Sequence, residues 1–447
     1  MPCKLFPLRW ESTGDRWWFA SPIDWAAANG HYVLVKELLH IDTNLLIKLT
    51  SLPRTRRLET VWDDESSFNE VAKCRSVVAR KLLHDSDTKK RYISLIRAGY
   101  GGWLLYTAAA AGDLDFVKEL LERDPLLVFG EGEYGVTDIL YAAARSKNSG
   151  VFKFLFDYSS SLSPATVEES SVFRLEMINR AVHAAARGGG LEILIQLLEE
   201  YGGDDPSGYR DAKGSTLLHS AAGRGQVQIV KHLISSYSNI VTAVDSRGST
   251  ALHVAAYFGQ LPVIKLLLSA SPSSASAVND DGDTFVHAAI SGFGSTDFRR
   301  LDRQIELIEE LVGWISFGEL INVRNKDGRT PLHLAVVNNI RGDIIDLIMT
   351  VPSVSLEIRD SDGKTPLDLL RQRPQSVVSY EILMKLLMSS SSSAAAAGGV
   401  SSPSDAAATW DEETKNAIVS DMRSHGMGTS PGTSFRIPDA EIFLYTG

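Results

Sequence analysis

The stretch Asn325-Lys-Asp-Gly-Arg-Thr-Pro-Leu-His-Leu-Ala335 decides the fold, because close copies of it recur along the chain. Clear copies begin at Asp211 and Asp245, and a shorter one begins at Asp360. Aligning every copy on its histidine position gives Asp24, Tyr106, Tyr141, His183, His219, His253, His287, His333 and Asp368. By subtraction, successive positions lie 82, 35, 42, 36, 34, 34, 46 and 35 residues apart. A recurring period of this length predicts a solenoid of stacked units.

The residue types explain the local structure of each unit. In the turn Asp211–Gly214, the carboxylate accepts hydrogen bonds from backbone amides and the glycine takes a positive φ. Thr-Pro then opens a first helix, and pairs such as Ala221-Ala222 let a second helix lie close. The second helix carries an apolar stripe, for example over Val227–Ile234, that only a neighbouring unit can bury. We therefore predict an all-α stack.

The run Thr330-Pro-Leu-His-Leu-Ala335 resembles the signature of the ankyrin-repeat family. The resemblance covers residues 20–388 and implies an ankyrin-repeat solenoid of about nine helix-pair repeats. Several repeats are degenerate, and those at the N-terminus are expected to cap the array. The segments Trp17-Trp-Phe19, Asp24–Gly30 and Ser430–Tyr445 resemble a plant group of soluble ankyrin-repeat proteins without membrane helices.

Period and composition divide the chain into five segments. They are an N-terminal cap with the first degenerate repeat (1–44), a basic helical insertion (45–100), the ankyrin-repeat array (101–388), a flexible Ser/Ala/Gly-rich linker (389–408) and a C-terminal helix with an apolar tail motif (409–447). Apolar residues at helical spacing predict a helix near residues 66–84 of the insertion. The 46-residue step predicts an extended loop or a lengthened second helix over residues 293–304.

The insertion is the basic part of an acidic protein, and its charges have several interpretations. They could bind a phosphate-bearing or acidic partner, or Arg54-Thr-Arg-Arg57 could be a nuclear address. They could also pair with nearby acids such as Asp63 and Glu70, in which case the insertion is structural.

Composition limits the classes of function. The chain has 447 residues, 44% of them hydrophobic, and a formal net charge of −10, which argues against bulk affinity for nucleic acid or anionic membrane. Cys3 and Cys74 are too few for a disulfide framework. No apolar h-region stands at the N-terminus and no apolar run reaches the roughly 18 residues that span a bilayer. We expect a soluble intracellular protein, cytoplasmic or nuclear, without membrane insertion.

No constellation of catalytic residues is present. The five aligned histidines are expected about 10 Å apart, too far to share a metal ion, and each is expected to bond the backbone of the adjacent turn. Phosphate-binding loops and nucleophile elbows are absent from the sequence. We expect no catalytic residues, no metal ligands and no cofactor, and hence no enzyme.

The resemblance implies that partners bind a concave face made by turn tips and the outward positions of the first helix. The candidate partner-binding residues are Lys213, Arg224, Arg247, Tyr257, Phe258, Asp281, Asp283, Lys326 and Arg329. Aromatic residues and arginine supply most interface hot spots, although Phe258 could instead pack onto the next repeat. The tip charges change sign along the array, which could fix a partner's register or simply form a solvated rim.

The tail beyond residue 388 departs from the repeat. Ser430, followed by Pro431, is a candidate phosphorylation site. The apolar end, Ile442–Tyr445, either folds back onto the array or is read by another protein.

These observations favour a monomeric scaffold or adaptor that binds other proteins on its concave face. The alternative is a nuclear regulatory protein whose basic insertion contacts a transcription complex or nucleic acid, although nucleic acid is not the expected ligand of so acidic a chain.

Overall fold

The computed structural model describes residues 20–61, 67–88, 94–129, 136–162, 167–201, 205–294, 301–314 and 317–372. All of these residues belong to the first of two compact units, Met1–Leu386, and the second unit is Leu387–Gly447. The predicted linker, the C-terminal helix, Ser430 and the apolar tail motif therefore lie outside the described residues.

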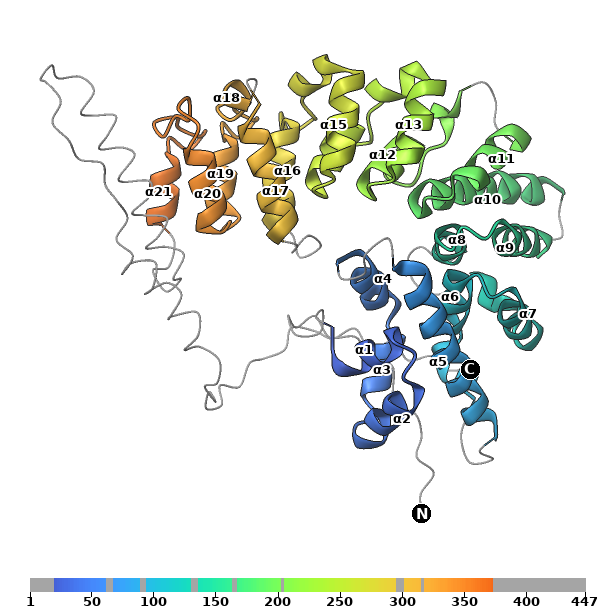
Figure 1. The fold of residues 1–447 in the computed structure, drawn as a ribbon. Coiled ribbons are helices and arrows are strands. Elements are labelled where there is room, and N and C mark those ends of the chain that lie inside the picture. The colour runs from blue at the N-terminus through green and yellow to red at the C-terminus, as the bar shows by residue number, and fades with distance from the viewer. Residues whose placement is uncertain are drawn as a thin grey trace, which may run out of the picture. The chain divides into compact units, whose positions relative to one another are not determined.

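Pairs of helices follow one another through the described part of the chain, as Figure 1 shows. The first helices of the pairs are α1 (Pro22–Ala28), α6 (Gly101–Ala111), α8 (Val136–Arg145), α10 (Val167–Gly188), α12 (Leu217–Gly223), α14 (Ala251–Tyr257), α16 (Phe285–Gly294), α19 (Pro331–Val337) and α21 (Pro366–Arg371). The second helices are α2 (Tyr32–Ile41), α7 (Leu114–Arg123), α9 (Ser149–Ser161), α11 (Leu191–Tyr201), α13 (Val227–Ser236), α15 (Leu261–Ala270), α17 (Leu301–Val312) and α20 (Gly342–Met349). Successive first helices pack side by side from α6 to α21. The predicted all-α repeat solenoid is confirmed.

The turn before each regular first helix forms as its residues predict. The Asp211 carboxylate accepts hydrogen bonds from the amides of Lys213 and Ser215, each at 2.9 Å, and Gly214 has a φ of 70°. Asp245 makes the same bonds in the next repeat. Only glycine adopts this φ without strain, so the motif fixes the turn in every copy.

Apolar stripes and small residues form the core between the two rows of helices. In α13, Ile229, Val230 and Leu233 are completely buried, as are Ala221 and Ala222 of α12. Burying each large aliphatic side chain contributes about 1.5–3 kcal/mol, which offsets the entropy of ordering the repeat.

The insertion between the first two repeats contains three helices, α3 (Leu45–Thr50), α4 (Leu52–Val61) and α5 (Phe68–Thr88). The helix predicted near residues 66–84 is confirmed as α5. It packs against both α1 and α6, and so takes a place in the row of first helices. The 46-residue step contains α16, which ends at Gly294, and α17, which begins at Leu301, followed by α18 (Phe317–Leu320). Residues 295–300 of the predicted loop lie outside the described part.

Candidate partner-binding site

Buried histidines connect the regular repeats to one another. The amide of Thr250 donates to Nδ1 of His253 at 3.2 Å, and the hydroxyl of Thr250 lies 2.9 Å from the same nitrogen. Since a backbone amide can only donate, Nδ1 is an acceptor and Nε2 carries the proton. Nε2 then donates to the carbonyl of Asp283 in the next turn, at 2.9 Å. His219, His287 and His333 repeat the arrangement with the carbonyls of Ser249, Arg329 and Lys364.

Burial keeps these imidazoles neutral. It is the largest cause lowering the pKa of His219, His253, His287 and His333. Burial, assisted by the positive charge of Arg187, lowers the pKa of His183 to about 4. His219, His253, His287 and His333 thus bond the backbone of the adjacent turn, as expected from the sequence. His183 differs, because its Nδ1 lies 2.8 Å from the side-chain hydroxyl of Ser220 in the next repeat.

A second set of bonds joins the turn tips through the backbone. The amide of Ser246 donates to the carbonyl of Lys213 at 3.0 Å, and the amide of Asp280 donates to the carbonyl of Arg247 at 3.0 Å. The amide of Lys326 continues the series to the carbonyl of Asp281 at 2.9 Å. The tips therefore form a bonded row to which Lys213, Arg247 and Asp281 contribute backbone carbonyl groups.

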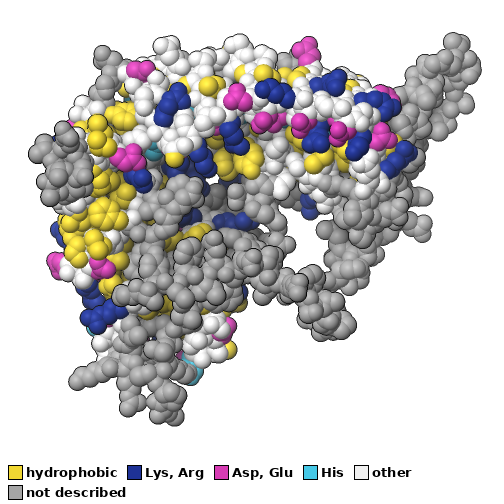
Figure 2. Space-filling model, turned by 180° about the vertical axis from the view of Figure 1, so that it is seen from behind, with side chains coloured by type: hydrophobic (Ala, Val, Ile, Leu, Met, Phe, Trp, Pro, Cys, Tyr) yellow, Lys and Arg dark blue, Asp and Glu magenta, His cyan; other side chains and the backbone are white. Residues whose placement is uncertain are grey.

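Four of the candidate residues project from this row into solvent: Lys213, Arg247, Asp281 and Lys326 are all exposed. Lys213, Arg247 and Asp281 occupy the same position in successive turns, directly before Gly214, Gly248 and Gly282. The tips thus present positive charges at the first two turns and a negative charge at the third. Figure 2 shows Lys, Arg, Asp and Glu side chains interspersed along this half of the molecule.

Asp283 and Arg329 differ from those four residues because their side chains contact other residues of the repeat array. Asp283 accepts a hydrogen bond from the side-chain amide of Asn325 at 2.9 Å. The Arg329 guanidinium lies 3.6 Å from Asp327 and 3.8 Å from the buried Asp360. Both residues are half-buried. Their contacts with Asn325 and Asp360 join neighbouring turns.

The aromatic candidates Tyr257 and Phe258 end α14 and are both half-buried. Their rings meet edge to face with centroids 5.1 Å apart. A Cβ on Gly223 would lie 3.3 Å from the Phe258 ring, so this ring packs onto the preceding repeat. This contact, on the preceding repeat and not on the following one, uses the space that Gly223 leaves. Tyr257 is the member of the pair better placed for a partner.

Arg224 is also held by the array. Its guanidinium lies 5.3 Å from the centre of the Tyr141 ring on α8, a cation–π arrangement. This contact fixes the direction of a half-buried side chain at the end of α12.

Comparison with known proteins agrees with this geometry. Residues 182–281 match the family described as ankyrin repeats (3 copies). The chain contains ankyrin repeats. Rabankyrin-5 of Mus musculus and of Homo sapiens are each 38% identical over 52 residues, 12% of this chain and 4% of theirs. The matched segment is thus a small part of those relatives.

Among solved structures, the complex of a predatory endopeptidase from Bdellovibrio bacteriovorus with its immunity protein contains a chain that overlaps this one at a TM-score of 0.36. The two are 24% identical, and the overlap covers 47% of this ankyrin chain and 97% of the other. So low a score carries no argument about function.

The degenerate ankyrin repeats near the N-terminus have their inner side covered by α4, which the sequence did not reveal. Glu59 of α4 is buried and accepts a hydrogen bond from the Tyr106 hydroxyl at 2.8 Å. The Arg145 guanidinium lies 3.3 Å from the same carboxylate and 3.7 Å from the centre of the Phe68 ring. Arg145 stands four residues after Tyr141, the position that Tyr257 occupies after His253. The candidate face is therefore closed at α8.

Two basic residues of α4 are paired inside the protein. Arg54 is only 1% exposed and forms a buried ion pair with Asp24. Arg56 pairs with Asp138 at 3.0 Å. These partners are acids of α1 and α8. Of the neighbouring acids considered from the sequence, Glu70 pairs with Lys73 at 3.0 Å, and Asp63 lies outside the described residues. Two of the three arginines of Arg54-Thr-Arg-Arg57 are thus engaged by acids of the same protein.

The part of the chain that the structure describes holds no group of three or more His, Cys, Asp or Glu side chains that could bind a metal ion. None of its helices combines the length and apolar character needed to cross a bilayer.

Proposed function

We propose that this ankyrin-repeat protein is a scaffold or adaptor that holds partner proteins on the face formed by α12, α14, α16, α19 and their turn tips. Ankyrin repeats are in general protein–protein interaction modules. The observation that carries the proposal is the bonded row of tips. Backbone hydrogen bonds hold Lys213, Arg247 and Asp281 at a fixed spacing while their charged ends stay exposed.

The binding face is expected to be polarised. Lys213 and Arg247 attract an acidic stretch of the partner, and Asp281 attracts a basic one, so the order of charges selects one direction of binding. Tyr257 supplies an aromatic anchor at the end of α14. Because Glu59 and Arg145 close the face at α8, the partner is expected to engage the repeats after α10.

The scaffold is proposed to act as a monomer, in the cytoplasm or nucleus, and without catalytic activity. The nuclear-regulator alternative needs basic residues that can reach nucleic acid or a transcription complex. Its main candidates, Arg54 and Arg56, are paired with Asp24 and Asp138, and this favours the scaffold.

Affinity purification with the full chain tests the proposal. The triple variant Lys213→Ala/Arg247→Ala/Tyr257→Ala should lose partners that the wild type retains. A matched control, Gln228→Ala/Lys231→Ala, changes exposed residues of the second helix α13 and should retain them. If both variants keep the same partners with the wild-type yield, the face has been assigned to the wrong side of the array.

A further inference from the structure

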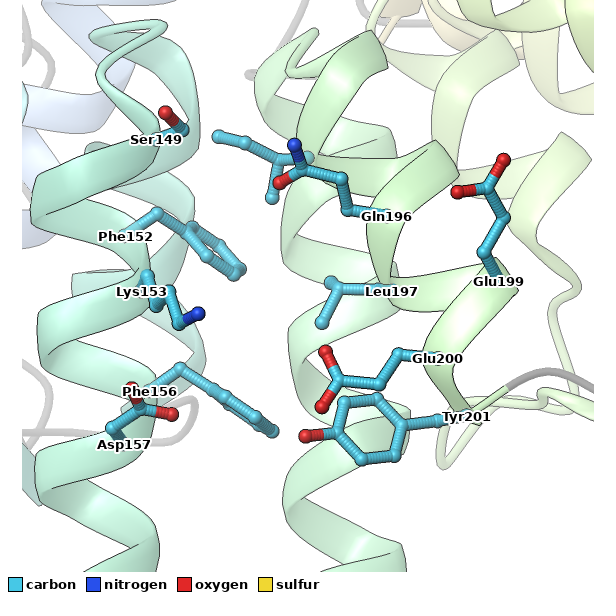
Figure 3. A pocket seen from close by; sticks show the side chains of 11 residues that line it. Ser149, Phe152, Lys153, Phe156, Asp157, Gln196, Leu197, Glu199, Glu200 and Tyr201 are labelled. Carbon is cyan, nitrogen blue, oxygen red and sulfur yellow. The ribbon is translucent and has the colours of Figure 1, made fainter.

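A groove lies between the second helices α9 and α11, on elements that the proposed binding face does not use. It encloses about 430 Å³. Figure 3 shows Phe152 and Phe156 pointing from α9 toward α11, and Leu197 pointing back toward α9. These side chains form an apolar floor about one helical turn long, because Phe152 and Phe156 are four residues apart. In Figure 2, hydrophobic side chains gather on the side of the molecule that holds α7, α9 and α11.

Carboxylates collect at one end of this groove. Asp157 and Glu200 lie near Tyr201 between the helices, whereas Glu199, which also lines the groove, points away from α9 (Figure 3). Lys153 is the one cation in the lining. The last turns of α9 and α11 contain no basic residue. A helix C-terminus carries partial negative charge, so acidic side chains there are unfavourable unless a cation compensates them.

On other second helices, acidic side chains pair with a Lys or Arg of the protein itself. On α17, Glu310 pairs with Lys265 of the neighbouring α15 at 2.9 Å. On α7, Glu119 pairs with Arg80 at 2.9 Å and with Arg123 at 2.7 Å. Across the α9–α11 groove, no ion pair joins the described Lys153, Asp157 and Glu199, whose ends are exposed. Arg174 of α10 lies over the Tyr201 ring, 5.8 Å from its centre, and offsets part of the negative charge. The lining itself still carries three carboxylates against Lys153, and this excess is available to a ligand.

We infer that the α9–α11 groove binds a cationic amphipathic segment of a partner protein. An apolar side chain of that segment lies over Phe152 and Phe156, and a Lys or Arg reaches the carboxylates of Asp157 and Glu200. Apolar contact provides the affinity, and the charges fix the orientation. This second binding surface is independent of the proposed concave face, so either can fail without the other.

Fluorescence anisotropy with the full chain tests the inference, using a labelled helical peptide of repeating Leu-Lys-Lys-Leu as the probe. The variant Glu199→Gln/Glu200→Gln should bind it about tenfold more weakly, the equivalent of roughly 1.4 kcal/mol. Gln196→Trp, which fills the groove without changing its charge, should also weaken binding. The matched control Glu306→Gln/Glu309→Gln removes two exposed carboxylates from α17 and should bind like the wild type.

Three results would overturn the inference. The first is equal weakening by the groove and control variants, which would indicate attraction to net negative charge alone. The second is no binding, or equal binding of a peptide with Glu in place of Lys. The third is sedimentation of the wild type as a dimer that Glu199→Gln/Glu200→Gln dissociates, since the occupant would then be a second copy of the chain.

Discussion

The repeats from α12 to α21 and those from α1 to α9 are connected by different chemistry. In the C-terminal set, one His–carbonyl bond and one backbone bond between tips recur at each step, as from His253 to Asp283 and from Lys213 to Ser246. In the N-terminal set, ion pairs that differ from helix to helix replace them, including Arg54–Asp24 and Arg56–Asp138. The repeated bonds leave the tips available, whereas the individual ion pairs use the inner side of the helices.

The contrast shows how one repeat family supports two roles. In the C-terminal repeats, the same hydrogen bonds between neutral, buried groups join each repeat to the next. Exposed side chains such as Arg247 are therefore not needed for stacking and can contact a partner. Where the stack depends on buried charges such as Glu59, the same surface becomes part of the core.

The largest expected effect comes from removing the centre of the N-terminal ion network. Glu59→Ala should lower the free energy of unfolding by about 3–5 kcal/mol, because it leaves the buried charge of Arg145 without its carboxylate. Urea denaturation of the full chain measures the loss. As a control, Arg80→Ala breaks a half-exposed pair with Glu119 and should cost no more than about 1 kcal/mol. Equal losses would show that the N-terminal set does not depend on its buried charges.

The next largest loss of stability is expected where two backbone segments of the C-terminal repeats lie close together. A Cβ on Gly292 would lie 1.9 Å from the carbonyl oxygen of Tyr257, and backbone cannot move aside as a side chain can. Gly292→Ala should therefore cost about 1–3 kcal/mol, measured as a fall in thermal stability. Gly208→Ala meets no atom within 4 Å and is the control. A rise in stability for Gly292→Ala would mean that helix propensity outweighs the clash and that α14 and α16 are less tightly packed.

The neutral histidines predict a pH dependence of the C-terminal set. Burial lowers the pKa of His219 and His253, so the unfolded chain binds protons more readily than the folded one. Their stabilising effect is present above the unfolded pKa of about 6.5 and is lost as pH falls, at about 1.4 kcal/mol for each unit of lowering. Unfolding free energies measured from pH 7 to 5 should fall less steeply for His219→Gln/His253→Gln than for the wild type. Identical slopes would show that these rings do not titrate with folding.

The smallest expected effect on stability concerns the tips. Lys213→Ala/Arg247→Ala removes exposed side chains and leaves the backbone bonds to Ser246 and Asp280, so stability should change by less than about 0.5 kcal/mol. Thermal melting of this variant checks the value. A larger loss would mean that the charged tips contribute to the stack, and the distinction between the two sets would weaken.

The sequence predicts the regular repeats well and the irregular ones poorly, for a physical reason. Thr330 and His333 are three residues apart, so the short pattern contains the whole turn and helix start. Glu59 and Arg145 are 86 residues apart, and no local pattern reveals that they meet. The spacing of apolar residues predicts the helix α5, but it does not predict that α5 packs between α1 and α6.

For the candidate binding residues, too, the sequence predicts features set within one turn but not those set by how two helices pack. The exposure of Lys213 and Arg247 follows from their positions in the turn. The packing of Phe258 on Gly223 could not be deduced, because it depends on how two repeats approach. The aromatic composition of α9 is visible in the sequence, yet its groove with α11 depends on the spacing of two helices.

The long separation between Glu59 and Arg145 has a consequence for how the chain folds. Closing a long loop costs more entropy than closing a short one, so pairing across 86 residues follows the local repeats in time. During synthesis α4 leaves the ribosome before its α8 partner exists, and at roughly 5–20 residues per second it waits several seconds with unpaired charges. We therefore expect nucleation among the later repeats and closure of the N-terminal end last, the reverse of the order of synthesis.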